Sequence, residues 1–265
     1  MIVILLLLSS CNIFESDNVP EPPELEPSEI FDEGINIWFI ERTTIPELRL
    51  MMRTKGKFGH SSIDFEVLDS YSDSELTREI IIKGIFKHPA FPEESEPARA
   101  TSHVSFLDIE ENLTLLIRDG PITDSFNVDI SEEKVDISVL DTTFTEVSYD
   151  RYYRRPPNSM YFFCGTIEAK KHLCEELHEL MKADANLREF QFPDDGVIPY
   201  PKKASRSFDY NAPMRYYLYN SSEEYRHAGQ LLRDFADENG VRNEDNWLYI
   251  VNWQELAFSS YYMIF

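Results

Sequence analysis

Two pairs of residues have the spacing at which one helix could hold a metal ion. His172 and Glu176 lie four residues apart, and Glu175 and His178 lie three apart, so the members of each pair share a helical face. Neither pair has a third ligand nearby in the sequence. Because His172 also matches His227 in a repeat described below, we expect a structural role for these side chains, and no metal site or cofactor.

Signatures of catalysis are weak in this sequence. Ser131-Glu132-Glu133-Lys134 has Ser-x-x-Lys spacing, but it lies in an acidic turn and not on a helix. The sequence contains no nucleophile elbow, zinc-peptidase motif, phosphate loop or dinucleotide-binding loop. A site assembled from distant residues, such as His60, His103 and acids, stays open because catalytic groups are recognised by geometry and not by spacing. The sequence therefore identifies no catalytic residue.

Basic residues gather on either side of the segment 156–201. One cluster includes Arg154 and Arg155, and the other includes Lys202 and Lys203. Arginine and lysine side chains at these positions could hold an anion between the two clusters. In a chain this acidic, the favoured interpretation is that they form salt bridges with acids of a neighbouring domain.

The second half of the chain repeats itself at an offset of 55 residues. Each copy has an aromatic run, a capping residue, an amphipathic stretch and a second apolar run, which predicts strand, helix and strand. Thr166 and Ser221 occupy the matching capping positions, Glu224 completes a capping box with Ser221, and Gly240 suits the end of the second helix.

Two such units in tandem predict a ferredoxin-like domain over residues 151–265, with two helices on one face of an antiparallel sheet. Strand alternation then places Phe162, Tyr217 and Tyr219 on the face without helices. We expect the first half of the chain or the C-terminal segment to cover these rings. The alternative is an aromatic platform for a ligand or a partner strand.

Residues 36–150 contain short β-branched and aromatic runs separated by turns such as Lys55-Gly56-Lys57 and Asp119-Gly120-Pro121. This spacing predicts a β-rich, antiparallel, sandwich-like domain. The whole chain is therefore predicted to be α+β, with the β-rich domain first and the ferredoxin-like domain second, joined near Pro156-Pro157.

The N-terminus has an apolar run, Ile2 to Leu8, that leads into Leu8-Ser9-Ser10-Cys11. The run is too short to cross a hydrocarbon core of about 30 Å as a helix. The four residues resemble the lipobox of bacterial lipoprotein signals. The resemblance implies that residues 1–11 hold a cleaved signal and an acylated Cys11, and that the lipid anchors the protein in the cell envelope, at the outer membrane facing the periplasm or at the cell surface.

With Cys11 committed to lipid, the remaining cysteines are Cys164 and Cys174. A compartment outside the cytosol permits a disulfide between them. The predicted strand parity, with Phe163 toward the helix, instead directs Cys164 away from the helix that carries Cys174. We therefore expect two buried free thiols.

Residues 12–35 form a predicted acidic, proline-rich tether: residues 13–35 contain eight acids, four prolines and no Lys or Arg. The formal net charge of −23 is distributed as −8 over residues 1–35, −12 over 36–150 and −3 over 151–265. Such a surface argues against nucleic-acid binding and would attract a basic protein. Acidity that serves solubility alone is the other interpretation.

These features predict a lipid-anchored envelope protein that binds a basic protein partner through its acidic surface, as an immunity or accessory factor would. An envelope hydrolase with a site assembled from distant residues is the alternative. An assembly accessory that uses the aromatic sheet face is a third possibility, and it requires that face to be exposed.

Overall fold

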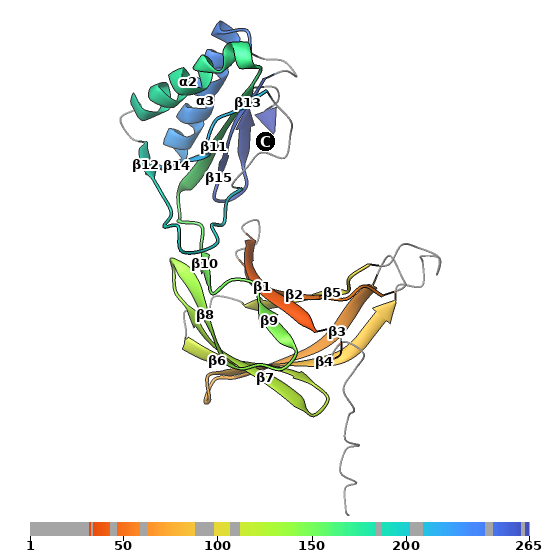
Figure 1. Cartoon of the computed structure of the whole chain (residues 1–265). Coiled ribbons are helices and arrows are strands. Elements are labelled where there is room, and N and C mark those ends of the chain that lie inside the picture. The colour runs from red at the N-terminus through yellow and green to blue at the C-terminus, as the bar shows by residue number, and fades with distance from the viewer. Residues whose placement is uncertain are drawn as a thin grey trace, which may run out of the picture.

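The computed structural model describes residues 32, 34–42, 47–58, 63–87, 98–106, 112–183, 187–201, 209–241, 246–260 and 263–264. The chain has an α+β fold rich in strands, arranged as two sheets in separate lobes (Figure 1). The first sheet lies within residues 35–153 and the second within residues 159–264. Cys11 and most of the predicted tether lie outside the described residues.

The first sheet has ten strands in the order β10-β8-β7-β6-β4-β3-β5-β2-β1-β9. Their bounds are β1 (Ile35–Arg42), β2 (Glu47–Thr54), β3 (Ile63–Ser72), β4 (Thr77–Lys87), β5 (Thr101–Phe106), β6 (Asn112–Asp119), β7 (Ile122–Ile130), β8 (Lys134–Asp141), β9 (Thr145–Val147) and β10 (Arg151–Tyr153). Three pairs are parallel, namely β1 with β9, β3 with β5 and β4 with β6. The predicted antiparallel sandwich is therefore replaced by one curled, mixed sheet (Figure 1).

The curl follows from the positions of β9 and β10. These two strands are neighbours in the chain but lie at opposite ends of the strand order. The segment 145–153 pairs with β1 through Thr145 to Val147 and with β8 through Arg151 to Tyr153. Because this short segment pairs with both β1 and β8, it holds the two ends of the sheet together around a common interior. β10, which the sequence assigned to the second domain, belongs to this sheet.

Alternating apolar residues fill the interior of the curled sheet. In β6, for example, Leu113, Leu115 and Ile117 are buried while the residues between them are partly exposed. Each such side chain contributes about 1.5–3 kcal/mol when it is removed from water. The period of two in the sequence thus determines which face of each strand lines this core.

A buried carboxylate holds the turn between β8 and β9. Asp124 of β7 is fully buried and accepts hydrogen bonds from the backbone N–H groups of Thr143, Phe144 and Thr145 at 2.7, 3.0 and 2.6 Å. Phe144 and Thr145 are buried, so their N–H groups depend on this carboxylate as an acceptor within the protein. Asp124 therefore directs the chain from the end of β8 toward its pairing with β1.

The second sheet has the strand order β12-β14-β11-β15-β16-β17, with β13 beside β11, and its described pairs are antiparallel. Its elements are β11 (Ser159–Thr166), η1 (Glu168–Lys170), α2 (His172–Ala183), β12 (Arg188–Phe190), β13 (Tyr210–Asn211), β14 (Arg215–Leu218), α3 (Ser222–Glu238), β15 (Trp247–Asn252), β16 (Ala257–Ser259) and β17 (Met263–Ile264). Both helices lie on the same face of the sheet (Figure 1). The predicted strand, helix and strand occur in both copies of the repeat.

The helix ends show which capping predictions are correct. The Ser221 hydroxyl accepts the N–H of Glu224 at 3.3 Å, while the Glu224 carboxylate accepts the N–H of Asn220 at 2.6 Å. Gly240, with φ of +60°, follows the last turn, as predicted. The predicted cap at Thr166 is wrong, because β11 continues through this residue and a 3₁₀ turn precedes α2.

Cys164 and Cys174 form a disulfide, with their Cα atoms 5.6 Å apart, so the predicted free thiols are wrong. Both side chains are buried, Cys164 on β11 and Cys174 on the apolar face of α2. The bond joins the strand to the helix that packs on it.

Within the described residues, no helix is long and apolar enough to cross a membrane.

Candidate functional site

Phe162, Tyr217 and Tyr219, the predicted open-face residues, lie instead under the helices. They are 1, 0 and 6% exposed, and they belong to one core cluster with Leu177 of α2 and Leu232 of α3. The predicted parity is therefore wrong by one residue. The physical reason is that β11 is buried on both faces, so no polar position marks the outside of the strand. These three side chains cannot form an exposed platform.

The face without helices carries a different set of aromatic rings. Tyr161 and Phe163 of β11 both contact Tyr249 of β15, with centroid distances of 5.9 and 4.8 Å. Tyr200 stacks on Tyr216 of β14 at 5.7 Å, and its hydroxyl lies 2.6 Å from the Ser159 Oγ. Because Tyr200 comes from the segment that follows β12, the chain between the repeats packs on this face and buries much of its aromatic area.

A groove lies at the β12 edge of this aromatic face. It encloses about 470 Å³ and is lined by Phe190, Phe192, Met214 and Tyr216, among others. Phe192 contacts both Phe190 and Tyr216, at 5.2 and 5.3 Å. The rings are half-buried and in contact with one another, so the chain itself already uses much of their apolar surface.

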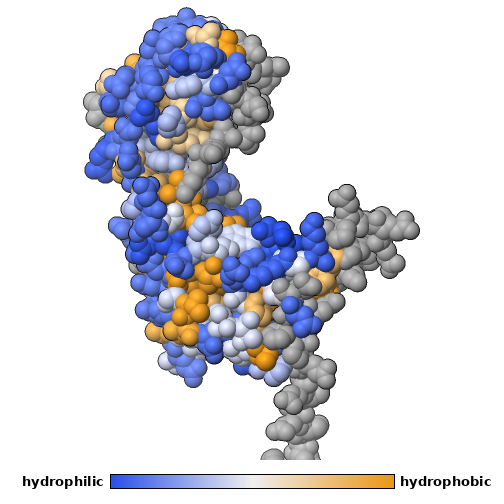
Figure 2. Space-filling model, viewed as in Figure 1, coloured by the Kyte–Doolittle hydropathy of each residue, from blue (hydrophilic) through white to orange (hydrophobic). Residues whose placement is uncertain are grey.

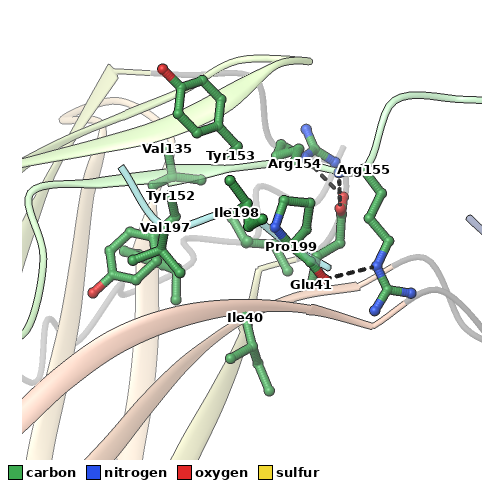
Figure 3. Close-up of a pocket in the computed structure, with 12 residues that line it drawn as sticks. Ile40, Glu41, Val135, Tyr152, Tyr153, Arg154, Arg155, Val197, Ile198 and Pro199 are labelled. Atoms are coloured by element: carbon green, nitrogen blue, oxygen red, sulfur yellow. Dashed lines mark hydrogen bonds and ion pairs between the residues drawn. The ribbon is translucent and has the colours of Figure 1, made fainter. Parts of the chain in front are cut away.

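Arg154 and Arg155, the predicted anion contacts, line a pocket of about 240 Å³ where the two lobes meet (Figure 3). The Glu41 carboxylate accepts the Arg154 Nε at 3.0 Å and the Arg155 backbone N–H at 2.7 Å. Arg154 also donates to the carbonyl of Ser131 at 2.9 Å. Glu41 is only 12% exposed in its side chain, so these bonds are partly shielded from water.

Arg155 joins the second lobe to the same network. Its Nη1 donates to Glu255 at 3.1 Å and its Nε to the carbonyl of Pro199 at 3.4 Å, while the guanidinium lies 5.5 Å from the Tyr200 ring centre. The two arginines thus contact acids of both lobes, which agrees with the salt-bridge interpretation. Lys202 and Lys203 lie outside the described residues.

The rest of the junction pocket is apolar. Phe39, Val135 and Tyr152 belong to the buried core of the curled sheet, and Val197 and Ile198 come from the segment between the repeats. Burial raises the pKa of the Tyr152 hydroxyl, so it stays neutral. This pocket consists of core walls closed by an ion-pair network, an arrangement that fixes one lobe against the other.

The histidines are placed as structural or surface residues. His178 is buried, and its Nδ1 contacts the Tyr217 hydroxyl, while burial lowers the pKa of its ring. His172 and His103 are exposed, and His60 lies outside the described residues. In the described part of the chain no three His, Cys, Asp or Glu side chains converge on a metal position. Among the histidines that the structure describes, none lines the junction pocket or the groove.

Acidic side chains are exposed along β3 and the turn that follows it. Asp64, Glu66, Asp69, Asp73 and Glu75 are all exposed. Asp69 forms two hydrogen bonds with the buried arginine of β4, at 2.8 and 2.6 Å. These carboxylates belong to the part of the chain with the largest negative charge, so the first lobe presents a negative field to solvent.

Three exposed apolar side chains were not predicted from the sequence. Leu140, Tyr149 and Val139 are 60, 59 and 52% exposed, more than the other large hydrophobic residues that the structure describes. Val139 continues the alternating apolar run of Val135 and Ile137, which does not mark it as exposed. The sequence does contain a signal of this exposure: Val139 and Leu140 are adjacent apolar residues, so the alternation of polar and apolar residues ends just before Asp141.

Comparison with known proteins gives no assignment. No family model, curated protein or solved structure matches this chain.

Proposed function

We propose that this chain is a lipid-anchored cell-envelope protein that binds a basic protein partner through the acidic surface of its first lobe, as an immunity or accessory factor. The observation that carries the proposal is the uneven charge, −12 over residues 36–150 against −3 over 151–265. Exposed carboxylates such as Glu66, Asp73 and Glu75 present that charge to solvent.

A summed negative field increases the association rate of a positively charged partner and repels anionic ones. Electrostatic steering raises association rates by about 10-fold to 1,000-fold, and it weakens with salt because the screening length is about 8 Å at physiological ionic strength. Nucleic acid, whose binding requires Lys and Arg against phosphates, is disfavoured by the same field.

The lipobox resemblance, the acidic segment after it and the disulfide support the proposed envelope location. The stretch Leu8-Ser9-Ser10-Cys11 resembles a lipobox, and the acidic residues 12–35 would keep the folded lobes away from anionic lipid. Disulfides persist mainly in oxidising compartments, and the bond between Cys164 and Cys174 fits such a location. Mass spectrometry of native protein should find a mature N-terminus at an acylated Cys11. An intact, unmodified leader would contradict the proposed anchor.

We also propose that the second lobe is a ferredoxin-like domain. The order β12-β14-β11-β15 with antiparallel neighbours, and two strand-helix-strand units whose helices share a face, support this assignment. Such domains serve many unrelated functions, so the assignment does not select an activity.

The binding proposal is tested by capture from envelope extracts at about 50 and 300 mM salt. A basic protein should be retained at low salt and released at high salt. Replacing Glu66 and Glu75 by Lys should reduce capture several-fold, because both are exposed on the first lobe. The matched control replaces Glu176 and Glu238, exposed on the helices of the second lobe, and should retain the partner. Capture that ignores ionic strength would contradict the proposal.

A further inference from the structure

The junction pocket has a volume that suits a small molecule. Its volume of about 240 Å³ exceeds the roughly 150 Å³ of an apolar cavity that binds benzene, but it is below the roughly 300–1,000 Å³ of pockets that bind drug-sized ligands. Figure 2 shows hydrophobic residues at the surface of the narrow junction between the lobes, with hydrophilic residues around them. A ligand of this pocket would therefore be small, and part of it would be apolar.

Backbone pairing between the lobes fixes the walls of this pocket. Val197, from the segment between the repeats, forms a parallel bridge with Tyr152 of β10. The Tyr153 N–H donates to the Val197 carbonyl at 2.8 Å, and the Val197 N–H donates to the Arg151 carbonyl at 2.9 Å. A Cβ atom on Gly196 would lie 2.9 Å from the Arg151 side chain, so glycine permits this close approach. The pocket is therefore preformed, which reduces the cost of ordering its walls when a ligand binds.

Apolar and charged residues lie at opposite ends of the pocket (Figure 3). The apolar end includes Val135, Tyr152 and Val197. The charged end consists of Glu41, Arg154 and Arg155. Ligand sites commonly combine apolar walls with a few polar groups that fix the orientation of the ligand. A molecule that matches both ends of this pocket has an apolar body and one charged group.

The charged end has one more positive than negative charge. Two arginines and one carboxylate line the pocket, and the tyrosines beside them are neutral at pH 7. Arg155 also pairs with Glu255, but that side chain is 45% exposed, so water and salt screen its charge. Arg154 uses two of its five N–H donors, one on Glu41 and one on a carbonyl, so it retains donors for an anion. Because more distant charges are screened over about 8 Å, the local surplus favours an anionic group.

We propose that the junction pocket binds a small carboxylate with an apolar body, the chemistry of a short-chain fatty acid or an aryl acid. The apolar body packs between Val135, Tyr152 and Val197, and the carboxylate pairs with the arginine end of the pocket. Arginine suits this role because its planar group of N–H donors matches the two oxygens of a carboxylate. The site differs from the acidic surface proposed to bind a basic protein, and the inference does not depend on that function.

Isothermal titration calorimetry on the full chain tests the class of ligand. The probes are phenylacetate and hexanoate, and each should bind saturably with a dissociation constant below about 1 mM. Phenylacetamide and hexanamide have nearly the same shape without the charge, while acetate has the charge without the apolar body. Each of these three control compounds should bind at least about tenfold more weakly than the probes, because each lacks one half of the match.

Variants that fill the apolar end locate the site. Val135→Phe and Val197→Phe place a larger side chain in the pocket from the two lobes, and each should weaken phenylacetate binding at least about tenfold. The matched control is Val139→Phe on the same strand as Val135, which is 52% exposed and should change binding less than about twofold. Thermal unfolding checks that each variant folds. Because Val135 is fully buried, Val197→Phe decides the result if Val135→Phe does not fold.

A charge variant tests the other end of the pocket. Arg154→Gln should reduce the preference for phenylacetate over phenylacetamide at least about fivefold, because it removes the surplus positive charge. Arg118→Gln, on β6 outside the pocket, should leave that preference unchanged. A comparison of charged and neutral probes separates loss of the charge from a general change in the shape of the pocket.

Three results would overturn the inference. One is the absence of saturable binding of either probe up to about 10 mM. The second is equal binding of the carboxylates and their amides, and the third is binding that persists in the folded filled variants. None of these results bears on salt-dependent capture of a basic protein, so the ligand site and the proposed function can fail separately.

Discussion

The disulfide between Cys164 and Cys174 should stabilise the second lobe by an amount that its loop length determines. The two cysteines are ten residues apart in sequence. Closing a loop of this length in the unfolded chain removes roughly 9 cal/mol/K of entropy, or about 3 kcal/mol at 25 °C. Reduction of the bond should therefore lower the free energy of unfolding of this lobe by about that amount, without changing the first lobe.

Urea unfolding followed by tryptophan fluorescence measures this effect. Trp247 lies on β15, opposite Gly165 and one residue from the partner of Cys164, and Trp38 lies on β1 of the first sheet. In a Trp38→Phe background the fluorescence reports the second lobe alone. With a urea dependence of about 1–3 kcal/mol/M, reduction should lower the midpoint by about 1–3 M.

Two controls separate the bond from other effects. The double variant Cys164→Ala with Cys174→Ala should unfold at or below the midpoint of the reduced protein, because the sulfur atoms are buried and their loss also leaves space. Adding reductant to this variant should change nothing. A native protein in which both thiols react with an alkylating agent, or a midpoint that is the same with and without reductant, would refute the reasoning.

Three further predictions concern buried polar groups. Glu41→Gln removes the charge that faces Arg154 and should increase proteolysis at the junction between the lobes, whereas the exposed Glu146→Gln should not. Asp124→Ala removes the acceptor of three N–H groups, two of them on the buried residues Phe144 and Thr145, and urea unfolding should show a loss of about 3 kcal/mol or more from the first lobe. Desolvation holds the pKa of His178 below its usual 6.5 in the folded state. The contribution of the neutral ring to the free energy of unfolding should therefore be complete above about pH 6.5, and it should be lost as the pH drops through the folded pKa. His178→Gln should flatten this dependence across about pH 5–8.

Local signals in the sequence predicted the second lobe well. The capping residue Ser221, the helix end at Gly240 and the strand Trp247–Asn252 all occur as predicted. Each depends on residues close in the chain, whose hydrogen bonds or backbone angles are set locally. The 55-residue repeat made the prediction of strand, helix and strand more reliable, because the same pattern occurs twice in the sequence.

Two of the errors in this lobe, the face of Phe162 and the free thiols, share one cause. β11 has apolar residues on both faces, so alternation of polar and apolar residues could not show which face meets the helices. Assigning Phe163 to the helix side moved Phe162 to the wrong face and directed Cys164 away from Cys174. One parity error on β11 thus produced both the wrong face for Phe162 and the predicted free thiols.

The sequence predicted the strands of the first lobe, but it did not predict how these strands pair into a sheet. Periodicity gives the faces of a strand and says nothing of its neighbours, which are set by contacts far apart in sequence. The pairing of β4 with β6 and of β1 with β9 required parallel neighbours that no turn signal indicates. The curl depends on how β9 and β10 pair, and each has only three residues.

The end of β8 illustrates why an exposed apolar edge can escape prediction from the sequence while the core does not. Val139 continues the alternation of the buried residues Val135 and Ile137, so the pattern alone assigns it to the interior. Its exposure follows from topology: β10 turns away from β8 after Asp136 to let β9 reach β1, and the edge beyond that point loses its cover. The connection that closes the curled sheet therefore also leaves this apolar edge exposed.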